Sequence, residues 1–152
     1  NLKGDEIVFD LYSGLGTISQ FIAKKAKKVI GIESINEAVI SAKESAIENK
    51  VNNVDFVVGD MKKIFNPLFI SKYGNPDLII TDPPRDGMHK DVIKEILKLK
   101  TKKIIYVSCN PSTQYRDLEL LKEKYKIIKI QPVDMFPQTD HVENIVLLSY
   151  KN

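Results

Sequence analysis

A single cysteine, Cys109, lies in the stretch YVSCNPSTQYRDL, after a β-branched run and directly before a helix-like segment. Asn110 is a favourable N-cap, and Pro111 suits the first position of a helix. The thiol would therefore precede a helix N-terminus, whose partial positive charge favours the nucleophilic thiolate. The alternative is an inert cysteine buried at a strand end. The residues expected around Cys109 in the fold decide between these two interpretations.

Two glycines follow the first strand-like run, in the stretch DLYSGLG. Gly14 and Gly16 let the backbone turn sharply and let a ligand approach it closely. A dinucleotide fingerprint would require a third glycine at the position of Ser19. Glu33 ends the second run, where a carboxylate can bind both ribose hydroxyls of an adenosine and would repel a 2′-phosphate. This pattern favours an adenosine ligand without a pyrophosphate, and S-adenosylmethionine is the leading candidate.

Two aspartates follow later strand-like runs. Asp60 could receive the adenine amino group, although an N-cap of the next helix explains it nearly as well. Asp82 precedes Pro83 and Pro84, which fix an extended backbone and hold its carboxylate rigidly at the strand end. Such an acceptor could meet the charged end of the cofactor and the N–H edge of a planar base. Methyltransferases that act on exocyclic amino groups usually carry an aromatic residue after these prolines, so Arg85 argues against amino-nitrogen methylation.

A reactive thiol beside a sulfonium cofactor predicts methylation of a carbon that is itself a poor nucleophile, such as C5 of a pyrimidine. Thiolate attack on C6 of uracil places negative charge on C5, which can then take a methyl group. A general base must afterwards remove the C5 proton. The segment MFPQTDHVE supplies Asp140, His141 and Glu143. We favour Glu143 as the base, and His141, whose titration range suits proton transfer, is the second candidate.

Short apolar runs alternate with helix-length amphipathic segments, which predicts a parallel sheet with helices on both faces. The expected strands are residues 7–11, 29–32, 54–58, 78–81, 104–107, 127–133 and 145–150, and the expected helices are residues 17–27, 36–49, 61–70, 89–99 and 112–125. Asn36 is the expected cap of the second helix. No helix separates the last two strands, so one of them should be antiparallel. The predicted fold is an α/β, Rossmann-like, seven-stranded sheet with the candidate residues at the carboxyl ends of its strands.

Composition agrees with one globular domain over residues 1–152, with 43% apolar and 28% charged side chains. One cysteine cannot form an internal disulfide, and with only two histidines the chain is a poor candidate for a metal site. No apolar run reaches the roughly 18 residues of a membrane span. We therefore expect a cytoplasmic monomer without a metal. The net charge of +3 permits RNA binding without arguing for it.

Basic residues gather in two clusters at the amino ends of expected strands, away from the candidate site. The clusters are Lys24, Lys25, Lys27 and Lys28, and Lys98, Lys100, Lys102 and Lys103. We interpret both as solvated surface. Arg85, His89 and Arg116 lie nearer to the reactive edge and are better candidates for phosphate contacts.

The stretches DLYSGLGTIS, DPPRDGM, VSCNPST and PVDMFPQTDHVENIVLL occur in this order and spacing. They closely resemble the RNA uracil-C5 methyltransferase family, whose members make 5-methyluridine in 23S ribosomal RNA or transfer RNA. The resemblance covers essentially the whole chain. It implies a class I S-adenosylmethionine-dependent methyltransferase domain with Cys109 as nucleophile and Glu143, rather than His141, as base. The residues that it implies around the cofactor are Tyr12, Thr17, Glu33, Asp60 and Asp82.

The resemblance also implies that the chain is the catalytic part of a longer protein with an RNA-binding part at its N-terminus. The substrate should be a uridine in a single-stranded RNA loop, because the base must leave its stack to reach Cys109. The MFPQTDHVE ending looks more like the ribosomal branch, so 23S ribosomal RNA is the expected substrate and transfer RNA the alternative. The rival functions are a cytosine-C5 RNA methyltransferase, an amino-nitrogen methyltransferase and a non-catalytic S-adenosylmethionine-binding subunit that binds RNA.

Overall fold

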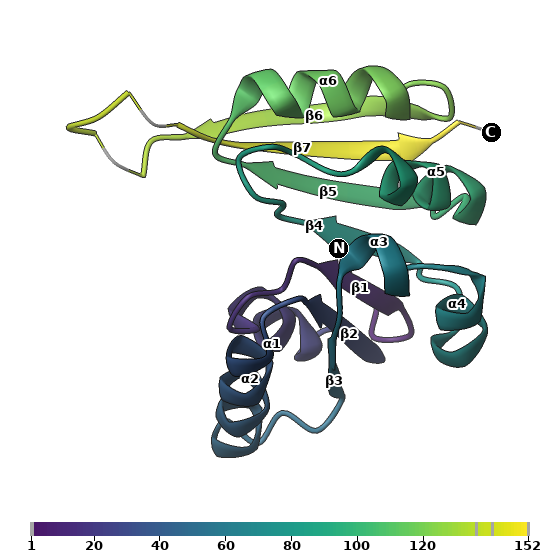
Figure 1. Cartoon of the computed structure of the whole chain (residues 1–152), viewed down its shortest axis with the longest axis vertical. Helices are drawn as coiled ribbons and strands as arrows, with labels where there is room; N and C mark the ends of the chain where they lie inside the picture. Colours follow the sequence, from purple (N-terminus) through teal and green to yellow (C-terminus); the bar gives the residue numbers. More distant parts are fainter. Residues whose placement is uncertain (1, 136, 141, 152) are drawn as a thin grey trace.

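The computed structural model describes residues 2–135, 137–140 and 142–151. Within them, seven strands form one sheet in the order β3-β2-β1-β4-β5-β7-β6 (Figure 1). The strands are β1 (Ile7–Leu11), β2 (Lys28–Glu33), β3 (Val54–Val58), β4 (Leu78–Thr81), β5 (Lys103–Ser108), β6 (Tyr125–Val133) and β7 (Glu143–Tyr150). Strands β1 to β5 are parallel, whereas β7 is antiparallel to both β5 and β6. This confirms the predicted sheet, which is mostly parallel with one antiparallel strand.

Helices cover both faces of the sheet. They are α1 (Thr17–Ala23), α2 (Asn36–Glu48), α3 (Met61–Ile64), α4 (Pro67–Tyr73), α5 (Lys90–Leu99) and α6 (Pro111–Leu121). Successive residues of a strand point to opposite faces, so Val8 packs against Ala23 of α1 while Phe9 packs against the α3–α6 layer. On the same face as α1, α2 covers Phe56 of β3.

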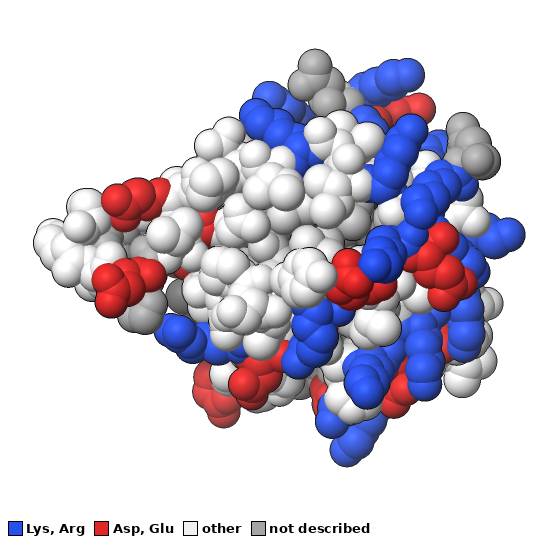
Figure 2. All heavy atoms as spheres, turned by 90° about the horizontal axis from the view of Figure 1, so that it is seen from above, with Lys and Arg blue, Asp and Glu red and all other residues white. Residues whose placement is uncertain are grey.

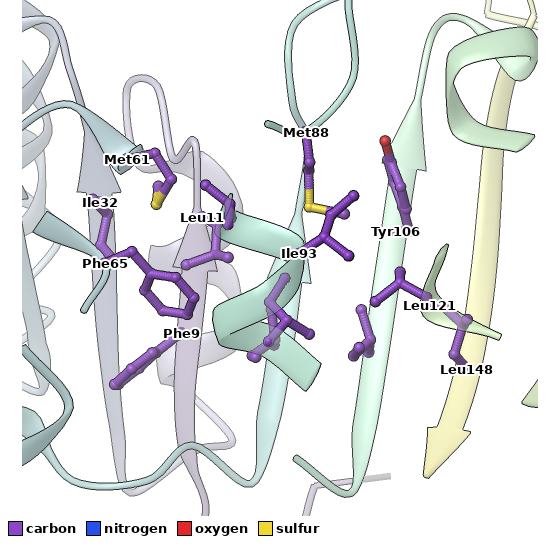
Figure 3. Close-up of a cluster of buried hydrophobic side chains, with 14 of the residues drawn as sticks. Phe9, Leu11, Ile32, Met61, Phe65, Met88, Ile93, Tyr106, Leu121 and Leu148 are labelled. Carbon is purple, nitrogen blue, oxygen red and sulfur yellow. The ribbon is translucent and has the colours of Figure 1, made fainter. Parts of the chain in front are cut away.

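The larger core lies between the sheet and the layer of α3 to α6 (Figure 3). The rings of Phe9 and Phe69 meet edge to face, with 5.5 Å between their centroids. Ile93 of α5 and Leu121 of α6 are at least 99% buried in the same cluster. Burial of each such side chain stabilises the fold by about 1.5–3 kcal/mol. The helices α5 and α6 therefore pack stably against the sheet.

One predicted helix, residues 61–70, is two helices in the structure. Pro67 has no N–H and disfavours helical backbone at the residue before it, so α3 ends ahead of Asn66. Asn66 instead caps α4, because its Oδ1 accepts a hydrogen bond from the N–H of Leu68 at 2.9 Å.

Three other predicted boundaries were wrong. The first helix ends at Ala23 rather than at residue 27. The N-cap of α2 is Ile35, without a side-chain hydrogen bond, whereas Asn36 is already helical. The last helix ends at Leu121, and Tyr125 opens β6, where it pairs with Tyr150 and is 1% exposed. Burial of the Tyr125 ring in the sheet outweighs the helical spacing that suggested a longer α6.

The last strand in the sheet order, β6, forms one edge of the sheet and pairs only with β7 in the described part of the chain. Its isoleucines Ile127, Ile128 and Ile130 are 49%, 52% and 55% exposed. Lys126 and Lys129 alternate with them and are also exposed. The pairing with β7 carries an irregularity between residues 127 and 129.

The parallel strands all end at one edge of the sheet. In Figure 1, β5 points toward the side from which the β6–β7 connection projects. This edge therefore brings together the turn after β1, Glu33 at the end of β2, Asp82 after β4 and Cys109 after β5. Glu143, the first residue of the antiparallel β7, starts from the same edge.

Candidate active site at the carboxyl edge of the sheet

An open cavity of about 950 Å³ lies at this edge. Its wall contains four of the predicted cofactor residues, Tyr12, Glu33, Asp60 and Asp82. Other parts of the wall come from residues 32–35, 59–62, 84, 86–90 and 116. A cavity of this volume suits a ligand of the size of a nucleoside or small cofactor.

Glu33 is held rigidly in the cavity wall. Its Oε1 accepts hydrogen bonds from the N–H groups of Ser34 (2.6 Å) and Ile35 (2.9 Å), and its Oε2 accepts one from Gly14 (3.0 Å). Burial raises the pKa of Glu33, but these hydrogen bonds outweigh it and bring the pKa below its usual value. The carboxylate is therefore charged at neutral pH, and Oε2 retains a lone pair for a ligand hydroxyl.

The glycine turn, with Gly14, Gly16 and Thr17, lies next to Glu33 of the cavity wall, to which the N–H of Gly14 donates. Both glycines have positive φ angles, +52° and +75°. A Cβ on Gly16 would lie 2.4 Å from the ring of Phe56, whereas a Cβ on Gly14 would meet nothing within 4 Å. Thr17 is the first residue of α1. The structure therefore connects Gly14 to the site through its hydrogen bond to Glu33.

Tyr12 adopts a left-handed backbone with φ of 64°, which is uncommon for a tyrosine. This conformation stores strain of about 1–2 kcal/mol. Burial, and then the negative charges of Asp117 and Asp60, raise the pKa of Tyr12 to about 12. Its hydroxyl is therefore neutral at physiological pH.

Asp60 has the capping role that sequence offered as the second interpretation. Its Oδ1 accepts a hydrogen bond from the N–H of Lys62 at 3.0 Å, which caps α3. The residue also lines the cavity, so its other oxygen can still serve a ligand.

Cys109 and Glu143 lie at the same end of neighbouring strands. Ser108 of β5 pairs with Asn144 of β7 in an antiparallel ladder. Cys109 follows Ser108 and Glu143 precedes Asn144, so both residues lie just beyond the last pair of this ladder, at the carboxyl edge of the sheet. Cys109 is half-buried. Asn110 caps α6 as predicted, since its Oδ1 accepts from the N–H of Ser112 at 3.1 Å.

Asp82 belongs both to the cavity and to the neighbourhood of the Cys109–Glu143 pair. Burial and the negative charge of Glu143 raise the pKa of Asp82, and Asp82 also lines the cavity. The arrangement therefore places Asp82 in the wall of a nucleoside-sized cavity, with Cys109 and Glu143 at the same edge of the sheet. His141, the second candidate for the base, lies outside the described residues.

Charge is divided between the two edges of the sheet. Figure 2 shows acidic side chains on the projecting end at the left, while most Lys and Arg side chains lie toward the opposite end. The predicted lysine clusters belong to that opposite end, where Lys28 pairs with Asp55 at 2.9 Å and Lys102 with Asp77 at 3.0 Å. Among the described residues, no group of three or more His, Cys, Asp and Glu side chains could hold a metal ion. No helix in this part of the chain is long and apolar enough to cross a membrane.

The sequence model of the family described as tRNA (Uracil-5-)-methyltransferase matches residues 1–151. The chain belongs to this family. Its curated relatives include uncharacterized RNA methyltransferases of Bacteroides thetaiotaomicron, 55% identical over 99% of this chain and 33% of the relative, and of Porphyromonas gingivalis, 53% identical over 97% and 32%. The chain thus spans about a third of the length of these RNA methyltransferases.

Solved structures agree on the fold of this family member. The tRNA (uracil-54, C5)-methyltransferase of Pyrococcus abyssi, solved with S-adenosyl-L-homocysteine, has a TM-score of 0.84 and 35% identity over 97% of this chain and 35% of that one. The N-methyltransferase NodS of Bradyrhizobium japonicum shares the fold alone, with a TM-score of 0.78 and 11% identity over 98% of this chain and 80% of that one. The predicted class I S-adenosylmethionine-dependent methyltransferase fold is confirmed.

Sequence reasoning missed a buried carboxylate in this uracil-5-methyltransferase family member. Asp117 of α6 is 0% exposed, and full burial is rare for an aspartate. A signal was available, because Gln114, Asp117 and Leu121 recur at helical spacing and all face the sheet. Arg116, predicted to contact phosphate, donates to Asp117 at 2.8 Å and also lines the cavity.

Proposed function

We propose that the chain is the catalytic domain of an RNA methyltransferase that transfers a methyl group from S-adenosylmethionine to C5 of a uridine. The observation that supports the proposal is the pairing of Ser108 with Asn144, because it brings the neighbouring residues Cys109 and Glu143 to the carboxyl edge of the sheet, where the Glu143 charge acts on Asp82. Family membership supports the reaction class. A uridine target agrees with the related Pyrococcus abyssi protein, which is a tRNA (uracil-54, C5)-methyltransferase.

The cavity fits S-adenosylmethionine. Glu33 offers a charged acceptor at its wall for the ribose hydroxyls, and Asp60 offers a second acceptor for the adenine amino group. Asp82 would face the positively charged end of the cofactor. When bound there, S-adenosylmethionine supplies a methyl group on its sulfonium. An electron-rich carbon can take this methyl group, and S-adenosylhomocysteine is the leaving group.

The residues of the chain make C5 electron-rich and afterwards restore the ring. The Cys109 thiolate forms a bond to C6, and the C5–C6 electron pair moves to C5 and the neighbouring carbonyl. Cys109 directly precedes the N-terminus of α6, which Asn110 caps. After C5 has taken the methyl group, Glu143 removes the C5 proton. The electron pair of that C–H bond rebuilds the double bond and expels the thiolate.

The nature of the RNA is the finer part of the proposal. The MFPQTDHVE ending predicts 23S ribosomal RNA, whereas the family and the Pyrococcus relative are both named for transfer RNA. Methyl incorporation into a ribosomal and a transfer-RNA stem-loop, assayed side by side, distinguishes these substrates. A uridine in an unpaired loop is expected in either case.

Covalent trapping with 5-fluorouridine tests the mechanism. Fluorine at C5 cannot leave as a proton, so the methylated adduct should stall on Cys109. We expect a shifted band on a denaturing gel with the full-length gene product, S-adenosylmethionine and a 5-fluorouridine stem-loop. The band should disappear in Cys109→Ser and persist in Ser112→Ala, a control on the exposed first turn of α6.

The rival functions give different results. A non-catalytic subunit would bind S-adenosylhomocysteine but form no band. A cytosine-C5 enzyme would trap 5-fluorocytidine in place of 5-fluorouridine. Full methylation by Cys109→Ser would contradict the proposed nucleophile and favour amino-nitrogen chemistry.

A further inference from the structure

The buried carboxylate of Asp117 holds together three parts of the fold. Its Oδ2 accepts hydrogen bonds from the Tyr106 hydroxyl of β5 and from the N–H of Met88, both at 2.7 Å. Its Oδ1 accepts from Nε (3.0 Å) and Nη2 (2.8 Å) of Arg116. A carboxylate without solvent is costly unless it is paired and hydrogen-bonded in this way. Loss of any one partner would therefore disturb the others.

The helix α6, which carries Asp117, also forms hydrogen bonds with the segment 85–88. Asn110 Nδ2 and Thr113 Oγ1 both donate to the carbonyl of Arg85, at 3.0 and 2.9 Å. One turn after Thr113, Arg116 Nη2 donates to the carbonyl of Asp86 at 2.8 Å. Residues spaced by three lie on one face of a helix, so one face of α6 follows the whole segment.

Gly87 permits this close contact. A Cβ at this position would lie 2.6 Å from Asp117 Oδ2 and 2.7 Å from Arg116 Nη2. No side chain fits between the segment and the two charged groups. The glycine of the RDGM stretch is therefore explained by the approach of α6, not by the cavity alone.

The same segment forms a wall of the cofactor cavity, which Arg116 of α6 also lines. Pro84, Asp86, Gly87 and Met88 are among its lining residues. The helix α6 begins two residues after Cys109. One rigid unit thus carries the predicted nucleophile at its start and a cavity wall along its side.

We propose that Asp117 is a positioning residue, which fixes segment 85–88 on α6 and thereby sets the spacing between the cofactor cavity and Cys109. The inference rests on the proposed role of Cys109 in methyl transfer. Asp117 itself does not touch the reacting atoms. It acts through Met88, Arg116 and Tyr106.

The first test is independent of RNA and uses the full-length gene product. In Asp117→Asn, we expect amide hydrogen–deuterium exchange of residues 85–88 to accelerate at least tenfold, while β1 remains protected. Affinity for S-adenosylhomocysteine, measured by calorimetry, should fall about fivefold. The matched control is Asp55→Asn, which removes an exposed ion-pair partner on β3. Unchanged exchange of residues 85–88 would overturn the proposal, whether or not the protein methylates RNA.

The second test separates positioning from general structural damage. Thiolate attack alone can be followed as tritium release from RNA with 5-tritiated uridine, with S-adenosylhomocysteine at saturation. Cys109 adds to C6, a solvent proton adds to C5, tritium leaves as a proton and the thiolate is expelled. Methyl transfer is measured separately with saturating S-adenosylmethionine.

We expect Asp117→Asn to lower methyl transfer about 50-fold and tritium release less than fivefold, because only methyl transfer depends on the spacing to the cofactor. An equal loss of both would show a merely structural role and overturn the proposal. Tyr106→Phe removes one hydrogen bond without loss of the buried ring. It should also lower methyl transfer more than tritium release, by a smaller factor than Asp117→Asn does. This variant decides the question if Asp117→Asn does not fold. If the wild-type protein neither methylates RNA nor releases tritium, the proposed function is wrong. The amide hydrogen–deuterium exchange of residues 85–88 then tests the positioning role without reference to RNA.

Discussion

Asp82, which follows β4, and Glu143, the first residue of β7, interact through their like charges at the carboxyl edge of the sheet. Burial and the Glu143 charge both raise the pKa of Asp82. The relationship links the cofactor side of the site to its proton-transfer side.

Glu143→Gln should allow the adduct to form but not to resolve. The glutamine cannot remove the C5 proton, so the methylated RNA should stay attached to Cys109 even with ordinary uridine. We expect turnover to fall by about 100-fold or more and a covalent band to accumulate on a denaturing gel. Glu119→Gln, on the exposed surface of α6, is the control. Normal turnover of Glu143→Gln would remove it from the mechanism.

Glu33→Gln should weaken cofactor binding. A charged acceptor contributes about 1.5–3 kcal/mol to a hydrogen bond, so affinity for S-adenosylhomocysteine should fall at least tenfold. Calorimetry measures the effect, and Glu37→Gln, in the first turn of α2, is the control. If both variants bind equally well, the ribose does not lie at Glu33.

Asp10→Asn should change how stability depends on pH. Burial is the main reason why the pKa of Asp10 is raised from 3.8 to about 6, against the hydrogen bond from Ser19 at 2.5 Å. Between these values the unfolded state loses the proton first, so the wild-type free energy of unfolding should fall as pH rises from 4 to 6. The shift corresponds to about 3 kcal/mol.

In Asp10→Asn this decline should be absent. Urea unfolding at pH 4, 5, 6 and 7 measures it, and the exposed Asp5→Asn serves as control. A variant that keeps the wild-type slope would show that another group titrates in this range.

Gly16→Ala and Gly14→Ala should differ although both glycines have positive φ. The shared backbone strain costs about 1 kcal/mol. Gly16→Ala adds a clash with Phe56, where the new Cβ would lie at 2.4 Å, and overpacking of this kind costs about 1–3 kcal/mol more. Denaturant midpoints of the two variants give the difference directly. Equal destabilisation would mean that Phe56 moves aside at no cost.

Much of this architecture could be predicted because each strand has its own apolar run and each turn its own signal. Cys109 was found because Asn110 and Pro111 indicate a helix start. The pairing of Ser108 with Asn144 could not be predicted, since register depends on contacts between distant segments. The sequence pattern also gave wrong helix boundaries at two places. At Pro67 a new helix begins behind its capping residue, and at Tyr125 burial in the sheet outweighs the helical spacing.

The site was predicted less completely than the fold. Residue types at strand ends indicated Glu33, Asp60 and Asp82, all of which line the cavity. The hydrogen bond from the N–H of Gly14 to Glu33 could not be predicted, because it depends on how two strand ends meet in the fold. Asp117 was missed because a charged residue in an amphipathic helix is normally assigned to solvent, and only its partners on β5 and in segment 85–88 explain its burial.

The exposed edge strand β6 has a consequence for the behaviour of the chain in concentrated solution. One side of its backbone can template a strand of another molecule, and its exposed isoleucines would favour such aggregation. Lys126 and Lys129 repel a second copy of the same edge, and Pro132 has no N–H to offer it. These three residues therefore protect the domain against edge-to-edge association.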